Sequence, residues 1–294
     1  MSDKYAWNVM GTKRSIFAEL KRRGHDVFWV DKKAVKKADI LCRNYKADQV
    51  WLAHSNLLLL PGIKKNIPVP VIGFGFSDPY YFKPARFQSY DVYVTNNRKI
   101  YEQYKDKIKM FYNPTACDMR FHKRKDTTKT IDISLIGCGR HPRFPNRIER
   151  IEIVKRLRKD LPKAVIRTYG IRWDKHPDNR PTIIDDTFLN VIQHTKIGLD
   201  IQEVFSPLAH RMFEYIACGT PVITRRRSEV FEHLEEHKEI LAYDDYDELL
   251  AKLKCMLTFP KELDFLAEHG HQRVMKEHDI KNRVDGLEKF LGLE

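Results

Sequence analysis

Residues 210–224 of the chain, HRMFEYIACGTPVIT, combine a carboxylate with two basic side chains on one predicted helix. Apolar residues recur at helical spacing along one side of it, and they are Ala209, Met212, Phe213, Ile216 and Ala217. His210, Arg211 and Glu214 lie on the other side. A carboxylate at the mouth of an α/β crevice can accept hydrogen bonds from a ribose diol, and a nearby cation can meet phosphate. The pattern predicts either a nucleotide site or an ordinary packing helix whose Arg211 and Glu214 pair in solvent.

The residues around this helix indicate how it is held. Gly219 can end the helix in the left-handed conformation, Pro221 prevents its continuation, and residues 222–224 suit a buried strand. A second glycine turn, 137–140 (GCGR), follows another predicted strand. Its amide groups could meet a phosphate, with Arg140 adding charge, although glycine turns after strands are also routine.

Two side chains in the first half are candidates for acid–base chemistry. Asp78 follows a strand with two glycines, and it is a candidate catalytic base or acceptor ligand; the alternative is an Asp-Pro turn with a solvated carboxylate. His54 is a second candidate base, with helix capping or packing as its alternative. Residues 233–237 (HLEEH) have the spacing of an inverted zinc-peptidase motif, but such short patterns recur by accident, and we expect no metal site.

Strands that alternate with helices predict a parallel, doubly wound α/β architecture. The expected helices span residues 15–23, 47–60, 98–104, 147–160, 247–258, 261–278 and 280–291. The expected strands span residues 27–30, 69–73, 92–95, 131–137, 165–169, 197–201 and 222–224. The polar run 122–129 lacks apolar periodicity, so we place a linker there.

Composition indicates a globular protein of two domains. The chain has 294 residues, of which 42% are hydrophobic and 32% charged. No stretch approaches the ~18 apolar residues of a membrane span, and residues 1–9 do not resemble a secretory signal. Five widely spaced cysteines favour reduced thiols and a cytoplasmic location. Lys and Arg exceed Asp and Glu by 13, an excess typical of polyanion binding, although charge runs also form solvated faces.

The motif around Glu214 resembles the nucleotide-binding signature of the GT-B glycosyltransferases of the group 1 superfamily. Within it, the short spore-maturation-type subgroup of bacteria and phages is the most similar. Other segments resemble the family in the correct order over roughly residues 70–294, and they are residues 90–96, 113–122, 131–137, 196–201, 267–270 and 274–279.

The resemblance implies a GT-B fold, in which two Rossmann-like domains face a central cleft. Residues 1–123 would form the acceptor domain and residues 124–279 the nucleotide-sugar domain. Residues 280–294 would form a helix that packs back across the junction. Enzymes of this fold generally stabilise the leaving diphosphate with helix N-termini and cations, so we expect neither a metal nor a tightly bound cofactor.

We therefore expect a glycosyltransferase that moves a sugar from a nucleotide sugar, with a UDP-sugar as the leading donor, to a hydroxyl acceptor. The resemblance implies that Glu214 grips the donor ribose. The expected donor-binding residues are Glu214, Arg211, His210, Arg140, Gly137, Gly139, Gly219, Thr220 and Pro221, and the candidate catalytic residues are Asp78 and His54. Charge and aromatic content make a hydroxymethylated base in DNA the leading acceptor, and a phage-encoded enzyme would fit that role.

One departure from the family pattern leaves the stereochemistry open. Many members have a second glutamate eight positions before the signature glutamate, where this chain has Ser206, and Glu203 is out of register by three. We therefore predict neither retention nor inversion. The alternatives are a GT-B protein that binds nucleotide or nucleic acid without transferring sugar, and a basic DNA-binding protein of Rossmann-like fold.

Overall fold

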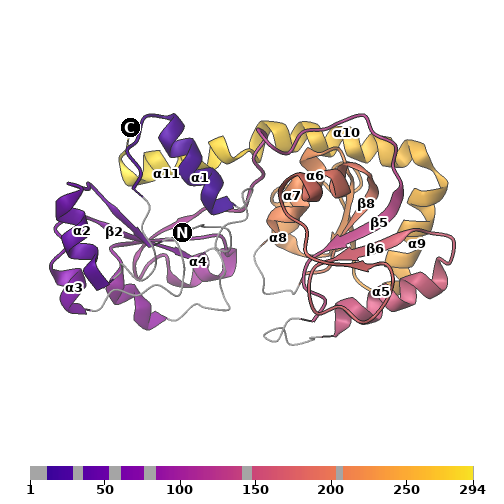
Figure 1. The fold of residues 1–294 in the computed structure, drawn as a ribbon, viewed down its shortest axis with the longest axis horizontal. Helices are drawn as coiled ribbons and strands as arrows, with labels where there is room; N and C mark the ends of the chain where they lie inside the picture. The colour runs from indigo at the N-terminus through magenta and orange to yellow at the C-terminus, as the bar shows by residue number, and fades with distance from the viewer. Residues whose placement is uncertain are drawn as a thin grey trace. The chain divides into compact units, whose positions relative to one another are not determined.

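The chain forms two compact units in the computed structural model (Figure 1). The described residues are 12–28, 36–52, 61–75, 84–140, 148–202 and 208–293. The N-terminal unit contains Ser15–Thr115, Phe205–Leu208 and Lys281–Glu294, and the C-terminal unit contains Met1–Arg14, Ala116–Val204 and Ala209–Ile280. Two boundaries between the units thus lie after Thr115 and after Ile280. The boundaries expected from the sequence lie after residues 123 and 279.

The N-terminal unit is built on a parallel sheet with strand order β1-β2-β3-β4. Its strands are β1 (Val50–Leu52), β2 (Val71–Gly75), β3 (Val92–Thr95) and β4 (Lys109–Tyr112). Its helices are α1 (Thr12–Arg22), α2 (Ala38–Asn44), α3 (Pro61–Lys65), α4 (Arg98–Tyr104) and α11 (Ile280–Leu291), with a short 3-10 helix at Pro84–Ser89. Every residue of β2 and β3 is buried, as expected for strands covered on both faces.

Several sequence predictions for this unit are confirmed, and two are contradicted in the residues that the structure describes. β3, α4 and α11 have the predicted bounds. The helix expected at 47–60 is contradicted, because Val50–Leu52 form β1, and residues 53–60 lie outside the described residues. The apolar spacing there also fits a short strand, and pairing with β2 decides between the two. Of the strand expected at 27–30, Val27 and Phe28 are not in a strand, and the other two positions are not described.

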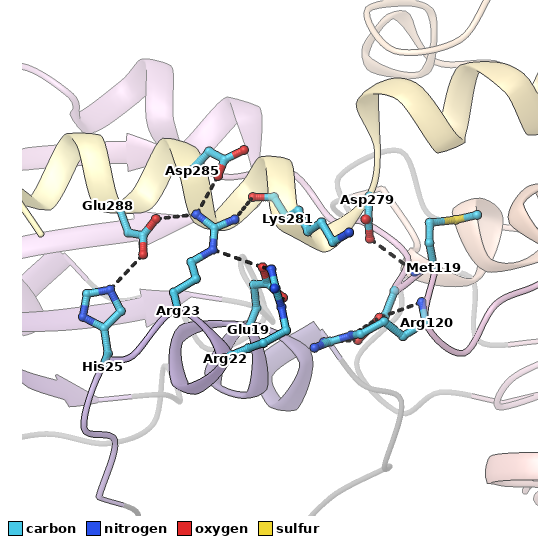
Figure 2. A network of polar contacts seen from close by, with 11 residues as sticks. Glu19, Arg22, Arg23, His25, Met119, Arg120, Asp279, Lys281, Asp285 and Glu288 are labelled. Carbon is cyan, nitrogen blue, oxygen red and sulfur yellow. Dashed lines mark hydrogen bonds and ion pairs between the residues drawn. The ribbon is translucent and has the colours of Figure 1, made fainter. Parts of the chain in front are cut away.

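Helix α11 packs on α1 and β4 within the N-terminal unit. Phe290 stacks on Phe111 with ring centroids 4.9 Å apart. Figure 2 shows Arg23, just after α1, between two carboxylates of α11: its Nη1 lies 2.6 Å from Asp285 Oδ1 and 2.5 Å from Glu288 Oε2. The same guanidinium binds the buried Glu19. The last helix of the sequence is therefore fastened to the first one described.

The C-terminal unit has a six-stranded parallel sheet with strand order β10-β9-β8-β5-β6-β7. Its strands are β5 (Ile131–Ile136), β6 (Ile166–Tyr169), β7 (Asn179–Arg180), β8 (Thr195–Asp200), β9 (Val222–Arg225) and β10 (Leu241–Tyr243). Successive strands run outward from β5 on one side and from β8 on the other, which is the order of dinucleotide-binding Rossmann folds. In such sheets, ligands bind beyond the carboxyl ends of the strands where the order reverses, here between β5 and β8.

Helices cover both faces of this sheet (Figure 1). They are α5 (Glu149–Asp160), α6 (Asp185–Gln193), α7 (His210–Ala217), α8 (Ser228–Phe231), α9 (Tyr246–Thr258) and α10 (Pro260–Glu277). Apolar residues of α5 and α9 share one core with β5 and β8, whereas α7 packs on the opposite face. The doubly wound α/β class is confirmed. The sequence predictions omitted α6, α8, β7 and β10, and within the described residues no helix is long and apolar enough to cross a membrane.

Candidate functional site

Helix α7 has the amphipathic form and the ending that its sequence predicts. Its apolar side is buried, with Met212 and Phe213 fully so. Gly219 has φ +73°, the left-handed conformation. Gly219 N–H donates to Ile216 O and Thr220 N–H to Tyr215 O, which is the Schellman arrangement of helix ends. The helix therefore stops at a defined residue, and its polar side chains have a fixed orientation.

The strands beneath α7 hold it in place through Tyr215. A Cβ on Gly198 of β8 would lie only 2.8 Å from the Tyr215 ring, so the helix sits close to the sheet because Gly198 lacks a side chain. The Tyr215 hydroxyl and Ser134 Oγ of β5 form a buried hydrogen bond of 2.6 Å. These contacts place α7 over β5 and β8, next to the reversal in strand order.

Glu214 of α7 is buried, with 3% of its surface exposed. Burial raises its pKa to about 8, against an opposing effect of the Arg211 charge. Its Oε2 has no hydrogen-bond partner among the described residues, and its Oε1 lies 3.5 Å from His122 Nε2. The alternative of a solvent-exposed Arg211–Glu214 ion pair is therefore wrong.

Arg211 lies against the glycine turn that follows β5. A Cβ on Gly137 would meet Arg211 Nη2 at 3.3 Å and Arg150 Nη1 at 3.6 Å, so two guanidinium groups flank this backbone position. Arg150 also donates to Cys138 O and to Ile201 O, which joins the ends of β5 and β8. Among the described residues, no carboxylate forms an ion pair with Arg211. The expected amide donors of this turn are already engaged, because Gly137 N–H donates to Tyr169 O at 2.7 Å and Gly139 N–H to Ile171 O at 3.0 Å. A phosphate beside the turn would rely on the guanidinium groups.

The rest of this turn is packed by Trp173. Its indole N–H donates to Gly137 O at 2.9 Å. A Cβ on Gly139 would lie 2.6 Å from the Trp173 ring, which explains a glycine at this position. Arg140 is exposed, and its guanidinium is 3.8 Å from Asp174. Within the described part of the chain, no contact joins Arg140 to Arg211 or Glu214, so its expected role stays a prediction.

The Gly219-Thr220-Pro221 turn makes structural contacts. Thr220 Oγ1 donates to Ile192 O at 2.9 Å and accepts from Lys129 Nζ at 3.4 Å, while the Arg124 side chain covers Gly219. The turn thus anchors the end of α7, and its expected contact with the donor stays a prediction. His210 is partly buried, and burial lowers its pKa to about 3 with a further contribution from Arg211.

His122 is a residue of this site that the sequence analysis missed. It belongs to the run 122–129, which was expected to be a solvated linker, yet its side chain is completely buried. Burial lowers its pKa to about 4. The only sequence signal is its position as the last residue of the segment 113–122 that resembles the family, and no periodicity predicts its burial.

Other predicted residues lie elsewhere or outside the description. Asp78, His54, Ser206 and Glu203 lie outside the described residues. The histidines of 233–237 do not share a helix, because α8 ends at Phe231. The described residues contain no group of three or more His, Cys, Asp or Glu side chains that could hold a metal ion.

Two of the three arginines at the end of β9, Arg225 and Arg226, are already engaged by carboxylates. Arg225 forms a bidentate ion pair with Glu149, and Arg226 pairs with Glu236, Asp244 and Glu248. Their charges are largely neutralised within the unit. Arg211 differs from these two arginines, because no ion pair joins it to a carboxylate among the described residues.

Comparison with known proteins agrees with this geometry. Residues 147–289 match the family model described as "Glycosyl transferase-like". No curated protein sequence matches the chain. Among solved structures, HepE of Anabaena, in complex with UDP and glucose, is 8% identical, with 94% of this chain and 88% of HepE covered and a TM-score of 0.64.

Two further structures are similar over most of their lengths. A glycosyltransferase of Rickettsia africae is 11% identical, with 97% of this chain and 88% of its own covered and a TM-score of 0.63. The sucrose-phosphate synthase of Thermosynechococcus elongatus is 10% identical, with 91% and 80% covered and a TM-score of 0.59. The chain therefore has the fold of the GT-B glycosyltransferases. Its C-terminal unit carries the glycosyl transferase-like pattern, and the spore-maturation-type subgroup stays a prediction.

Proposed function

We propose that the protein is a glycosyltransferase that takes a sugar from a nucleoside diphosphate donor bound at the C-terminal unit and passes it to a hydroxyl acceptor. The observation that carries the proposal is the placement of Arg211 and Glu214. Both lie on α7 at the reversal in strand order, with the cation against the Gly137 turn and the carboxyl group one helical turn further on. A diphosphate and the adjoining ribose need such a cation and such an acceptor.

The proposed reaction requires mainly electrostatic stabilisation of the leaving group. As the glycosidic bond breaks, negative charge develops on the departing diphosphate, and Arg211 and Arg150 beside Gly137 are positioned to stabilise it. Glu214 accepts hydrogen bonds from the ribose and orients the donor. Arg140 is a further phosphate ligand in this proposal, and no metal ion takes part.

We propose a UDP-sugar as the donor, with support from HepE, whose structure contains UDP and glucose. For the acceptor, we propose a hydroxymethylated base in DNA. This rests on the net charge of +13, because most contacts to nucleic acid go to phosphate. The neutralised Arg225 and Arg226 do not add to this support. Asp78 and His54 are the proposed catalytic groups on the acceptor side.

The test is a turnover assay with UDP-, GDP-, TDP- and ADP-sugars, in the presence of duplex DNA with or without hydroxymethylcytosine. Release of nucleoside diphosphate and the mass of the DNA are both measured. We expect UDP release from one sugar class, loss of turnover in Arg211→Ala, and added hexose mass only on modified DNA. Binding of UDP without any release would favour a non-catalytic nucleotide-binding protein, and salt-dependent DNA binding without nucleotide binding would favour the DNA-binding alternative.

Metal dependence is tested in the same assay. We expect turnover to be unchanged by EDTA, because guanidinium groups take the part that a divalent cation plays elsewhere. Loss of turnover with EDTA and its recovery with Mg²⁺ or Mn²⁺ would contradict the metal-independent proposal and leave the donor site standing.

A further inference from the structure

Two buried polar atoms beside α7 lack a hydrogen-bond partner in the described structure. They are Nε2 of His122 and Oε2 of Glu214. The two side chains face one another, with His122 Nε2 3.5 Å from Glu214 Oε1, which is longer than a good hydrogen bond. Buried polar groups are nearly always paired in folded proteins, so two neighbouring unpaired ones indicate a polar group that belongs between or beside them.

The backbone of Asp118 determines which ring nitrogen of His122 is available for a further hydrogen bond. Asp118 O accepts the backbone N–H groups of Phe121 and His122, at 3.0 and 2.9 Å. Asp118 N–H points at His122 Nδ1 at 3.1 Å. His122 Nδ1 also lies 2.9 Å from Asp118 O, so the Asp118 backbone engages Nδ1 in either tautomer and leaves Nε2 as the ring nitrogen that faces Glu214.

The surroundings keep the His122 ring neutral. Burial holds the pKa of His122 at about 4, so the imidazole stays uncharged at physiological pH. The titratable groups with an electrostatic influence on this pair are Arg211 and His210 of α7, Cys218 at its end, Cys117 and Asp118 of the segment before His122, and Lys129, which faces Cys218. None of them supplies a hydrogen bond to Nε2. A neutral imidazole nitrogen beside a carboxyl group is complementary to a pair of neighbouring hydroxyl groups, because each hydroxyl can both donate and accept.

We propose that His122 is a specificity-determining residue of the donor site, whose Nε2 forms a hydrogen bond with one ribose hydroxyl while Glu214 accepts from its neighbour. The inference rests on the proposed function, because the diol belongs to the donor nucleotide. The role of His122 has a consequence for nucleotide selectivity that a role of Glu214 alone would not have. The protein selects ribonucleotides with an intact 2′,3′-diol, and part of that selectivity depends on His122.

Two substitutions separate hydrogen bonding from packing. His122→Gln keeps a polar atom near the position of Nε2, whereas His122→Asn keeps one near Nδ1 and removes the polar atom that faces Glu214. The full-length variants are titrated calorimetrically with UDP, 2′-deoxy-UDP and 3′-deoxy-UDP. Thermal unfolding of each variant without nucleotide reports whether it is folded.

We expect the wild-type protein to prefer UDP over at least one deoxy analogue by about tenfold or more. His122→Asn should bring that preference to within about twofold, mainly by weakening UDP binding, and His122→Gln should keep most of it. If His122 only packs the loop, the two variants will weaken all three nucleotides equally, and the inference is overturned. A His122→Asn protein that keeps the wild-type preference also overturns it.

The same titrations separate failure of the inference from failure of the proposed function. If the wild-type protein binds UDP and Glu214→Ala does not, the donor site stands whatever His122 does. If the wild-type protein binds none of the nucleotides, the proposed donor site is wrong, and the role of His122 is rejected with it.

Discussion

The chemistry of α7 depends on a glutamate whose charge the folded chain disfavours. Glu214 is buried with Oε2 unpaired in the described structure, and Arg211 offsets only part of the cost of burying its charge. Such a carboxyl group contributes little to the stability of the free protein. It contributes to binding when the hydroxyl groups of a ligand donate hydrogen bonds to it. A stability cost at a binding residue is a common compromise between folding and function.

Glu214→Gln should stabilise the free protein, and the gain should depend on pH. The glutamate pKa is 4.5 in model compounds and about 8 in the fold, so the folded state holds its proton where the unfolded chain has lost it. The glutamate therefore lowers stability progressively from pH 4.5 to 8. We expect the variant to gain about 2–3 kcal/mol at pH 7 and little near pH 4.5 in urea unfolding. An equal gain at both pH values would contradict this account.

Loss of His122 should have the opposite pH signature. Its pKa falls from 6.5 to about 4 on folding, so the unfolded chain takes up a proton first as the pH drops. Wild-type stability should therefore decline from pH 6.5 toward pH 4. In His122→Gln this decline should be smaller by up to about 3 kcal/mol, measured by urea unfolding across that range. Parallel stability curves for the two proteins would count against a buried, neutral His122.

Arg211→Ala should weaken the diphosphate part of the ligand. We expect UDP affinity to fall by about 1.5–3 kcal/mol, because a charge-assisted hydrogen bond is lost, while the weak binding of uridine changes little. Arg156→Ala is the matched control, because that arginine is exposed on α5 and stacks on Tyr246. Equal losses for UDP and uridine would show that Arg211 acts through folding and not through phosphate.

Sequence reasoning proposed Glu214 and Arg211 as site residues and did not consider His122 or Arg150. The first two lie on a helix whose period can be read directly from the residues. His122 lies in a run of lysines and arginines, and its burial follows from contacts with α7, far away in the sequence. In the sequence, Arg150 is an ordinary basic residue of α5, and only the fold places it beside Gly137. Neither contact has a local signal.

At the scale of elements, the distance between α7 and β8 decides where Glu214 lies. Gly198→Ala would place a methyl group 2.8 Å from the Tyr215 ring, so helix and strand must separate. We expect a loss of about 1–3 kcal/mol in unfolding free energy, together with weaker UDP binding. Gly292→Ala is the control: nothing lies within 4 Å of its Cβ position, so only its left-handed φ of +67° is strained, and UDP binding should not change. Unchanged UDP affinity in Gly198→Ala would contradict this positioning role.

Elements with strong local signals were predicted best. α11, α4 and β3 have the predicted bounds, and α7 ends at the predicted glycine. Short strands were difficult to predict from the sequence. β10 has three residues and β7 has two, and β1 was read as part of a helix because its apolar spacing fits both structures. Strands of this length are decided by their neighbours in the sheet.

At the scale of the whole molecule, the contact between α11 and α1 joins the two ends of the described chain. Arg23→Ala removes the cation shared by Glu19, Asp285 and Glu288. We expect a loss of about 1–3 kcal/mol in unfolding free energy, because Glu288 is left partly buried without its arginine. Lys105→Ala, which removes an exposed pair with Glu102, should leave stability unchanged. An equal effect of the two changes in thermal unfolding would reject a special role for Arg23.

The alternation of strands and helices was enough to predict the α/β class, because each parallel pair needs a crossover. The boundary between the two units was harder to predict from the sequence. The segment 116–130 has little secondary structure, yet Cys117 N–H donates to His278 O and Met119 N–H to Asp279, so its start belongs to the C-terminal unit. Composition marked the charged run that follows as a linker, since charge is visible in the sequence and these backbone contacts are not.

The central claim is that Glu214 is part of a nucleotide site, and calorimetric titration of UDP into the wild-type and Glu214→Ala proteins tests it most directly. We predict saturable binding to the wild-type protein and binding weaker by about 2 kcal/mol or more in the variant, with both proteins folded. Equal affinity for the two proteins, or no binding by a folded wild-type protein, would contradict the account.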